Sequence, residues 1–284
     1  VDRWSAGRCL PEKQGVGLAR KIAGDIALVL IQAGCVEQRW IRCTDADVQV
    51  PIDYFEQLDG IEPESSAAIS NFVHLPEGGA SQQQAMQAYD AYLQSYVDGL
   101  AAAGSPYAFH TIGSLISVEA ESYAAVRGIP KRLAGEDFYL LNKLAKVGRV
   151  ISLNGEPIRI RGRLSDRVPF GTGAALTEIC DLSEEGEAYR PYELRTFDGL
   201  RHWLPVLDAF VLNPDVDLLR ASIDALGAPL GPALLETLED IGAIDAAVQA
   251  SRHVTGEQLR RRLTEWNDAF RTLKLIHGLR NKQM

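Results

Sequence analysis

Two carboxylates, one residue apart, follow a predicted strand in the segment 42–51, RCTDADVQVP. Asp45 and Asp47 could be ordinary turn residues, because Asp is common where a strand gives way to a loop. Ligands of open α/β sheets, however, bind outside the carboxyl ends of strands. Two carboxylates there can share Mg²⁺ or Mn²⁺ with water and substrate phosphate oxygens. The position therefore leaves two interpretations of Asp45 and Asp47 open, an ordinary turn and a metal site.

A second triplet of the same kind, Asp215 and Asp217, has a different context. It opens a helical pattern, and acids in a first helical turn are favoured by the helix dipole. We predict a solvated helix start there and no metal site. The comparison indicates that position, and not the triplet alone, carries the functional signal.

The acidic pair Glu136 and Asp137 opens a predicted helix in the segment AGEDFYLLNKL (134–144). The helix dipole alone can explain acids at this position. The alternative is that one carboxylate faces a cleft and takes the proton from an attacking hydroxyl group. A helix N-terminus beside Gly135 would hold such a base rigidly and allow close approach.

Four arginines gather in RIRGRLSDRVPFGTG (159–173), although the chain as a whole is acidic. Beside a phosphate site, arginines would neutralise a departing diphosphate. Arg159 and Arg161 could equally form the exposed face of an edge strand, where positive charge discourages aggregation. The diphosphate role is favoured for Arg163 and Arg167, which lie in the loop near two glycines.

Other side chains near these clusters have competing interpretations. His74 and His110 fall between the acidic pairs and could complete a metal site, but a structural or substrate-contacting role is favoured. Tyr107 and Phe109 could line an acceptor pocket. Trp40 lies in the strand before the D-x-D triplet and is predicted to be a core residue.

Predicted helices and strands alternate up to about residue 180, which is typical of an α/β layered domain. The first helix is expected to bury Ile22, Ile26, Val29 and Leu30 and to end at Gly34. The predicted helices are 17–33, 81–103, 119–126 and 136–147, and the predicted strands are 39–44, 111–118, 150–153 and 157–161.

The acidic segment 181–193, DLSEEGEAYRPYE, is predicted to link this domain, residues 1–180, to an all-helical region, residues 194–284. Pro and Gly are expected between the helices of that region. Its amphipathic last helix suits either intramolecular packing or oligomerisation. The predicted helical segments are 199–212, 215–227, 231–249 and 257–279.

The net charge of −9 argues against nonspecific binding to nucleic acid or to anionic lipid. No apolar run reaches the roughly 18–20 residues of a membrane span, and no secretory leader opens the chain. We therefore expect a cytoplasmic protein. The four cysteines have no metal-finger spacing and are expected to be buried thiols: Cys9, Cys35, Cys43 and Cys180. Because the first residue is Val, we interpret the chain as a fragment or a processed product.

Three segments in order resemble the second half of the catalytic domain of family 2 glycosyltransferases of the GT-A type. The helix EKQGVGLARKIAGDIAL, rich in small residues, precedes WIRCTDADVQVP. The segment AGSPYAFHTIGSLISVEAESYAAVRGIPKRLAGEDFYLLNKLAKVG then gives a G-S strand, a glycine–proline turn and the E-D pair. The resemblance covers roughly residues 12–180. It implies a GT-A-like mixed sheet flanked by helices, followed here by a helical C-terminal appendage.

The resemblance implies roles for individual residues. Asp45 and Asp47 match the acids that hold Mn²⁺ or Mg²⁺ and, through it, the diphosphate of a nucleotide sugar. Asp137 matches the catalytic base of inverting members, and Glu136 would orient it or contact the acceptor. More loosely, Arg163 and Arg167 resemble basic loop residues that would stabilise the product diphosphate, and Tyr107 is the candidate acceptor contact.

Two departures limit what the resemblance implies. The family's processive signature, Q-x-x-R-W, is missing, so a non-processive enzyme is expected. The strand–loop–helix units that grip the nucleoside in the family have no counterpart here, and the first βα units are expected to be missing. The sequence therefore does not identify the donor nucleotide, the sugar, the hydroxyl acceptor or the oligomeric state.

The expected chemistry is a metal-dependent single displacement of hexosyltransferase type, with Asp137 as the base. One alternative is a sugar nucleotidyltransferase on a similar sheet, although its G-x-G-x-R loop is absent from the sequence. The other is a non-catalytic interaction module whose helical region binds a partner.

Overall fold

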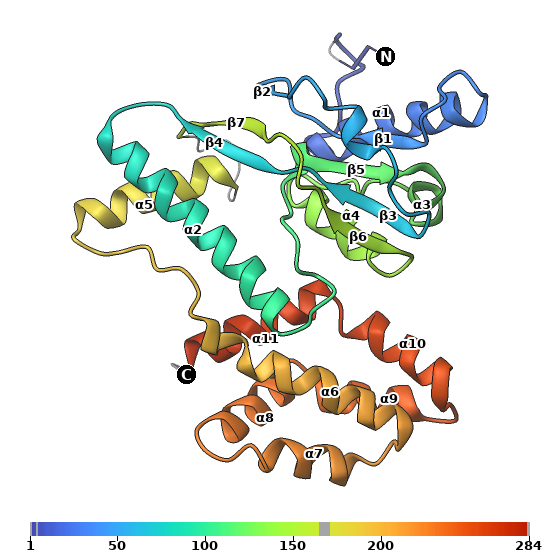
Figure 1. Cartoon of the computed structure of the whole chain (residues 1–284), viewed down its shortest axis with the longest axis vertical. Coiled ribbons are helices and arrows are strands. Elements are labelled where there is room, and N and C mark those ends of the chain that lie inside the picture. Colours follow the sequence, from blue (N-terminus) through green and yellow to red (C-terminus); the bar gives the residue numbers. More distant parts are fainter. Residues whose placement is uncertain (1, 4, 165–170, 283–284) are drawn as a thin grey trace. The chain divides into compact units, whose positions relative to one another are not determined.

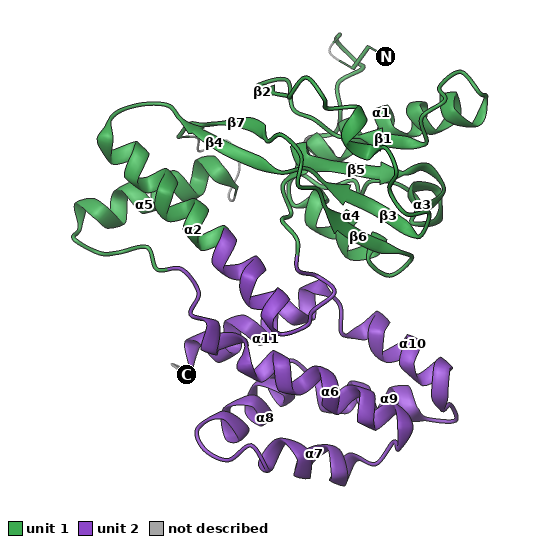
Figure 2. Ribbon diagram, viewed as in Figure 1, with its two compact units in different colours: residues 1–93, 109–190 green, residues 94–108, 191–284 purple. Residues whose placement is uncertain are grey.

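The computed structural model describes residues 2–3, 5–164 and 171–282. In these residues the chain is a mixed α/β protein with eleven α-helices and two mixed β-sheets (Figure 1). It divides into two compact units (Figure 2). Unit 1 comprises residues 1–93 and 109–190, and unit 2 comprises residues 94–108 and 191–284. Residues 94–108, which the sequence assigned to the first domain, thus group with the helical C-terminal residues.

The larger sheet of unit 1 has four strands in the order β1 (Trp40–Arg42), β5 (Ile116–Glu119), β3 (Ser65–Ile69) and β6 (Arg149–Ser152). Strand β5 is antiparallel to both β1 and β3, whereas β6 is parallel to β3. Strands β1, β3 and β6 therefore run in one direction. Their carboxyl ends lie at the same edge of the sheet as the amino end of β5, and this edge carries the candidate site.

Strand β3 was not predicted, because its sequence, SSAAI, has neither alternating polarity nor a run of β-branched residues. All five of its residues are buried. The Ser66 hydroxyl donates to the Leu144 carbonyl (3.0 Å) or the Arg149 carbonyl (3.1 Å), which compensates the cost of burying it. Small side chains let neighbouring elements approach the strand closely.

The second sheet of unit 1 has three strands in the order β2 (Val48–Gln49), β7 (Ile158–Gly162) and β4 (Phe72–Pro76). Strand β7 is central, antiparallel to β2 and parallel to β4. The interpretation of Arg159 and Arg161 as residues of an edge strand is therefore wrong. Arg161 instead lies 3.4 Å from the Glu77 carboxylate in a partly exposed ion pair.

Helix α1 (Gly15–Gln32) precedes β1, and helix α4 (Glu136–Leu144) precedes β6. Since each helix is joined to a following strand by a short link, it runs back along the sheet. The first turns of both helices therefore lie at the edge where β1 and β6 end. Between them, the predicted strand 111–118 begins only at Ile116 and is preceded by a 3₁₀ turn, η3 (Gly113–Leu115). Helix α3 (Ala120–Ala125) follows β5 as predicted.

The face on which α1 packs differs from the prediction. Ile26, Val29 and Leu30 are 42%, 61% and 41% exposed, whereas Gly17 and Gly24 are buried. A Cβ atom added at Gly17 would lie 2.4 Å from the Pro130 carbonyl oxygen, and one at Gly24 would lie 2.5 Å from the Tyr123 hydroxyl. The helix therefore packs through its glycines, and apolar periodicity misled the prediction. Its end was predicted correctly, with Gly34 at φ +71°.

Helix α2 (Ala80–Ala102) belongs to unit 1 up to residue 93, and this part packs beside α5 (Thr172–Glu184) (Figure 1). Met86 and Tyr89 of α2 contact Leu176 and Ile179 of α5 in one buried cluster. The predicted linker, 181–193, thus begins inside α5. The remaining 3₁₀ turns of unit 1 are η1 (Glu12–Gln14) and η2 (Glu56–Leu58).

In unit 2, two of the four predicted helical segments are each split into two helices. Gly242, at φ +76°, separates α8 from α9, and Asp268 caps the N-terminus of α11. Pro205 lies inside α6, contrary to the expectation that Pro falls between helices. The C-terminal elements of unit 2 are η4 (Leu194–Phe197), α6 (Asp198–Leu212), α7 (Val216–Asp224), α8 (Leu230–Asp240), α9 (Ala243–Ser251), α10 (Gly256–Trp266) and α11 (Ala269–Asn281).

The amphipathic last helix packs within unit 2, because Leu275, Ile276 and Leu279 of α11 are at most 1% exposed. The solvated helix start predicted at the second D-x-D triplet is confirmed, since the Asp215 carboxylate accepts from the backbone N–H groups of Asp217 and Leu218. Within the described ranges, no helix combines the length and apolarity needed to cross a bilayer.

The packing of α1 predicts that Gly17→Ala destabilises unit 1. The Gly17 N–H donates to the Arg132 carbonyl oxygen (3.0 Å), so the helix cannot move away without losing this bond. We expect the free energy of unfolding to fall by about 1–3 kcal/mol, although Ala is the better helix former. Gly79→Ala is the matched control, because an added Cβ there meets nothing within 4 Å. Equal melting temperatures for the two variants would contradict this account of the packing.

Candidate active site

Asp45 and Asp47 lie in the turn that leads from β1 of one sheet to β2 of the other. The Val48 N–H donates to the Asp45 carbonyl at 3.5 Å and closes the turn. Their side chains are 45% and 44% exposed. The D-x-D triplet therefore places two solvent-accessible carboxylates at the edge where β1 ends.

The Arg20 guanidinium, from α1, joins two of the predicted site acids. Its Nη1 group donates to Glu136 Oε1 at 3.1 Å, and its Nη2 group donates to Asp45 Oδ1 in a short hydrogen bond. The side chains of Arg20 and Glu136 are 16% and 6% exposed. Carboxylates from the D-x-D turn and from the first turn of α4 thus meet at one partly buried cation.

Asp137 is fixed beside this cluster by the backbone. Its Oδ1 atom accepts from the Phe138 N–H at 2.8 Å, and the Gly113 N–H is a further donor to its carboxylate. A Cβ atom at Gly113 would lie 1.8 Å from Arg20 Nη1, so the glycine also makes room for the guanidinium. Arg20 and Asp137 therefore both lie beside Gly113 in the 3₁₀ turn before β5.

Burial dominates the protonation of the E-D pair. It raises the pKa of Asp137, although the Phe138 N–H and the Arg20 charge act in the opposite direction. Burial and then the neighbouring Asp137 charge raise the pKa of Glu136, against the effect of Arg20. A carboxylate with a raised pKa is a stronger base than an exposed one. The pair therefore has the electrostatic character of a general base.

The guanidinium itself stays charged. Burial acts to lower the pKa of Arg20, but the charges of Asp45 and Glu136 outweigh it and raise the pKa. Burial raises the pKa of the adjacent Cys43 thiol to about 11, so this thiol is protonated at neutral pH and is a poor nucleophile. The expectation of buried cysteines holds for Cys43, whereas Cys9 and Cys35 are exposed and Cys180 is half-buried.

The basic loop reaches the D-x-D turn through Arg163, whose Nη2 group donates to Asp47 Oδ2 at 2.7 Å. Both side chains are largely exposed, at 54% and 44%. Arg167 lies outside the described residues.

Tyr107 belongs to unit 2, whereas the other candidate residues that the structure describes belong to unit 1. It is 5% exposed and lines a cavity of about 190 Å³ inside unit 2. Burial raises the pKa of its hydroxyl. Phe109, in unit 1, is also 5% exposed.

His74 pairs with Asp90, its Nδ1 atom lying 2.5 Å from Oδ1 of that residue. Its side chain is fully buried, in contact with the rings of Phe72 and Tyr89. The His110 ring also contacts Phe72. These contacts fit the structural role that was favoured for the histidines. Trp40 is confirmed as a core residue, 8% exposed and packed in one cluster with Leu58 and Ala68.

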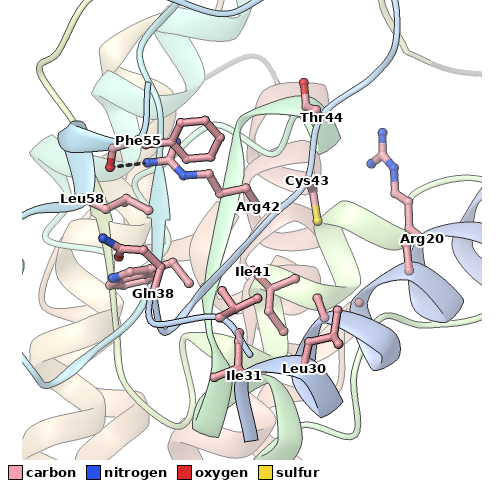
Figure 3. Close-up of a pocket in the computed structure, with 15 residues that line it drawn as sticks. Arg20, Leu30, Ile31, Gln38, Ile41, Arg42, Cys43, Thr44, Phe55 and Leu58 are labelled. Carbon is pink, nitrogen blue, oxygen red and sulfur yellow. Dashed lines mark hydrogen bonds between the residues drawn. The ribbon is translucent and has the colours of Figure 1, made fainter. Parts of the chain in front are cut away.

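A cavity of about 540 Å³ adjoins the acidic cluster (Figure 3). Arg20, Cys43 and Thr44 line it near the cluster, and the rest of its wall is mostly apolar. Arg42 crosses it toward the loop at Phe55, donating from Nη2 to that residue's carbonyl oxygen at 3.2 Å. The cavity is large enough for a ring system next to the D-x-D turn.

The donor set fits a divalent cation shared with a ligand. In the part of the chain that the structure describes, no group of three or more His, Cys, Asp or Glu side chains is placed to hold a metal ion. Mg²⁺ and Mn²⁺ sites in phosphate-binding enzymes, however, use one or two carboxylates together with phosphate oxygens and water. The accessible side chains of Asp45 and Asp47 can supply that number.

Sequence reasoning missed Arg20, Gly113 and Tyr89. Arg20 was assigned to a small-residue helix without a role. Its charge in the first turns of that helix, which precedes the strand before Asp45, was an available signal. Burial raises the pKa of the Tyr89 hydroxyl. This hydroxyl is hydrogen-bonded to Thr172 and lies near enough to Asp137 for the carboxylate charge to raise its pKa further. Nothing in the local sequence around Tyr89 indicates this proximity.

Comparisons of the chain with protein-family models, with curated proteins and with solved structures find no match.

The raised pKa of Asp137 predicts a specific pH dependence of stability. Because the folded chain binds a proton at this carboxyl more readily than the unfolded chain, burial of the charge costs free energy above the raised pKa and none at low pH. We expect Asp137→Asn to raise the free energy of unfolding at pH 8 and to change it little at pH values well below the ordinary Asp pKa of about 3.9. Urea unfolding at several pH values measures this difference. An equal gain in stability from Asp137→Asn at every pH would contradict the assignment.

Proposed function

We propose that the chain carries the acidic half of a glycosyltransferase site, which moves a sugar from a nucleotide-diphosphate donor to an acceptor hydroxyl with inversion. The observation that carries the proposal is the Arg20 bridge between Asp45 and Glu136, with Asp137 beside it. Acids from two segments far apart in the chain gather at one sheet edge, as sugar transfer at a metal-bound diphosphate requires.

Asp137 is the proposed general base. The backbone donors of Gly113 and Phe138 fix its carboxylate, and burial strengthens it as a proton acceptor. In the reaction, the acceptor oxygen forms a bond to the anomeric carbon from the face opposite the departing diphosphate. The bond from that carbon to the diphosphate oxygen breaks, and the acceptor proton passes to Asp137. The anomeric configuration is therefore inverted.

Glu136 is proposed to fix the position of the base. Its ion pair with Arg20 holds the first turn of α4 against α1, and thereby keeps the neighbouring carboxylate of Asp137 in one place. It is a positioning residue in this proposal.

Asp45 and Asp47 are the proposed ligands of Mn²⁺ or Mg²⁺. When bound, the ion supplies a positive charge that stabilises the leaving diphosphate. Arg163, beside Asp47, adds a guanidinium that can bind the same phosphate oxygens. The cavity beside Arg20 gives room for the part of the donor that is not transferred.

We also propose that the chain is related to family 2 glycosyltransferases of the GT-A type. Unit 1 has a mixed sheet with helices and carries acids at one strand edge, which supports a GT-A-like architecture and the family 2 relationship. We further propose a non-processive, cytoplasmic enzyme in which the helices of residues 194–281 are an appendage to the catalytic domain. Product identity separates this proposal from a nucleotidyltransferase, which releases pyrophosphate instead of a nucleoside diphosphate.

Asp137→Asn should reduce sugar transfer by about 10²–10⁴-fold without loss of fold. The assay uses UDP-, GDP- and ADP-sugars with Mn²⁺ and scores release of the nucleoside diphosphate, which can occur on water when no acceptor is present. Asp45→Asn should also abolish release, but through loss of metal-dependent donor binding, whereas Asp137→Asn should retain that binding. Should Asp137→Asn turn over normally, the proposed base would be wrong.

Asp217→Asn is the control, because this acid belongs to the second D-x-D triplet and starts a solvated helix of unit 2. Its rate should equal that of the unaltered chain. If nucleoside diphosphate is released equally well by the Asp45→Asn and Asp137→Asn variants, or if pyrophosphate is the product, the proposed function is contradicted.

A further inference from the structure

We propose that Arg20 and a divalent cation compete for the Asp45 carboxylate, so that Arg20 closes the D-x-D site until a cation displaces it. The inference rests on the proposed function, since it takes Asp45 to be a metal ligand. It adds that Arg20 controls access of the metal to Asp45. Once displaced, Arg20 can bind the diphosphate.

The competition follows from the position and charge of Arg20. Arg20 Nη2 donates to Asp45 Oδ1, while Nη1 donates to Glu136. Because the guanidinium is a rigid planar fork, it cannot follow a rotating Asp45 without leaving Glu136. A cation bound at Asp45 would also repel the adjacent guanidinium. Repulsion between the two positive charges therefore disfavours binding of both partners to the one carboxylate.

The two contacts of Arg20 differ in how readily they break. Glu136 is 6% exposed, so water competes little for its bond to Arg20, whereas Asp45 is 45% exposed. Exposed ion pairs contribute little to stability, and breaking a buried pair is costly. The Asp45 contact is therefore the one that yields. Arg20 stays on Glu136 with a free Nη2 group directed toward the D-x-D turn, where it can bind phosphate oxygens.

The other arginine of the site is a different case. Arg163 and Asp47 are both largely exposed, at 54% and 44%, so their pair is screened by solvent and salt. Its removal should alter metal affinity less than removal of Arg20.

Gly113 supplies an independent handle on the same contact. A Cβ atom there would lie 1.8 Å from Arg20 Nη1, so Gly113→Ala must move the guanidinium while leaving its charge in the protein. The substitution separates displacement of Arg20 from a simple loss of positive charge.

The experiment measures Mn²⁺ binding to the full chain from the electron paramagnetic resonance signal of free Mn²⁺. The control for Arg20→Met is Lys21→Met, because Lys21 is the next residue on α1, carries the same charge and pairs with Asp25 instead of Asp45. We expect Arg20→Met to bind Mn²⁺ about tenfold more tightly than the unaltered chain and Lys21→Met within about twofold of it.

Two further variants complete the test. Gly113→Ala should also bind Mn²⁺ more tightly, which would support displacement even if Arg20→Met failed to fold. Adding Asp45→Asn to Arg20→Met should abolish the gain.

Equal affinities for the Arg20 and Lys21 variants, or a gain that survives Asp45→Asn, would overturn the competition and leave sugar transfer standing. Failure of every variant to bind Mn²⁺ would overturn both the competition and the metal site of the proposed function.

Discussion

The partly buried Arg20 guanidinium holds the acidic cluster of unit 1 together. Asp45, Glu136 and Asp137 bring like charges into a small volume, and burial already disfavours the charged forms of Glu136 and Asp137. Arg20 offsets part of that cost through its two hydrogen bonds. Because its own charge is stabilised by the same carboxylates, the cation and the acids depend on each other.

The convergence of these residues follows from strand direction. Since β1, β3 and β6 run the same way, the helices that precede β1 and β6 both present their first turns at the edge where the D-x-D turn lies. Arg20 and the E-D pair are therefore neighbours although the chain separates them widely. Glycines set how closely the parts approach, with Gly17 packed against the loop before α4 and Gly113 beside the guanidinium.

The sequence was informative where local chemistry decides the structure. Three local features were predicted: the end of the first helix at Gly34, the strand before Asp45 and the start of a helix at the E-D pair. Turn glycines, apolar runs and first-turn acids specify such features within a few residues. Strand β3 was missed, since its small side chains are specified by neighbours distant in the chain. The same reason explains the error over α1, which packs through glycines. Arg20 was missed because its partners are identified only by the sheet topology.

The two acidic pairs have opposite surroundings, and this difference matches their proposed tasks. A metal ligand must exchange water and accept an incoming phosphate, which suits the exposed carboxylates of Asp45 and Asp47. A base must keep one position and attract the acceptor proton. The backbone donors hold the Asp137 carboxylate in place, and burial raises its pKa against the opposing effect of those donors. Arg20 lies between the two environments, with a buried contact on one side and an exposed one on the other, and is thus the residue able to couple them.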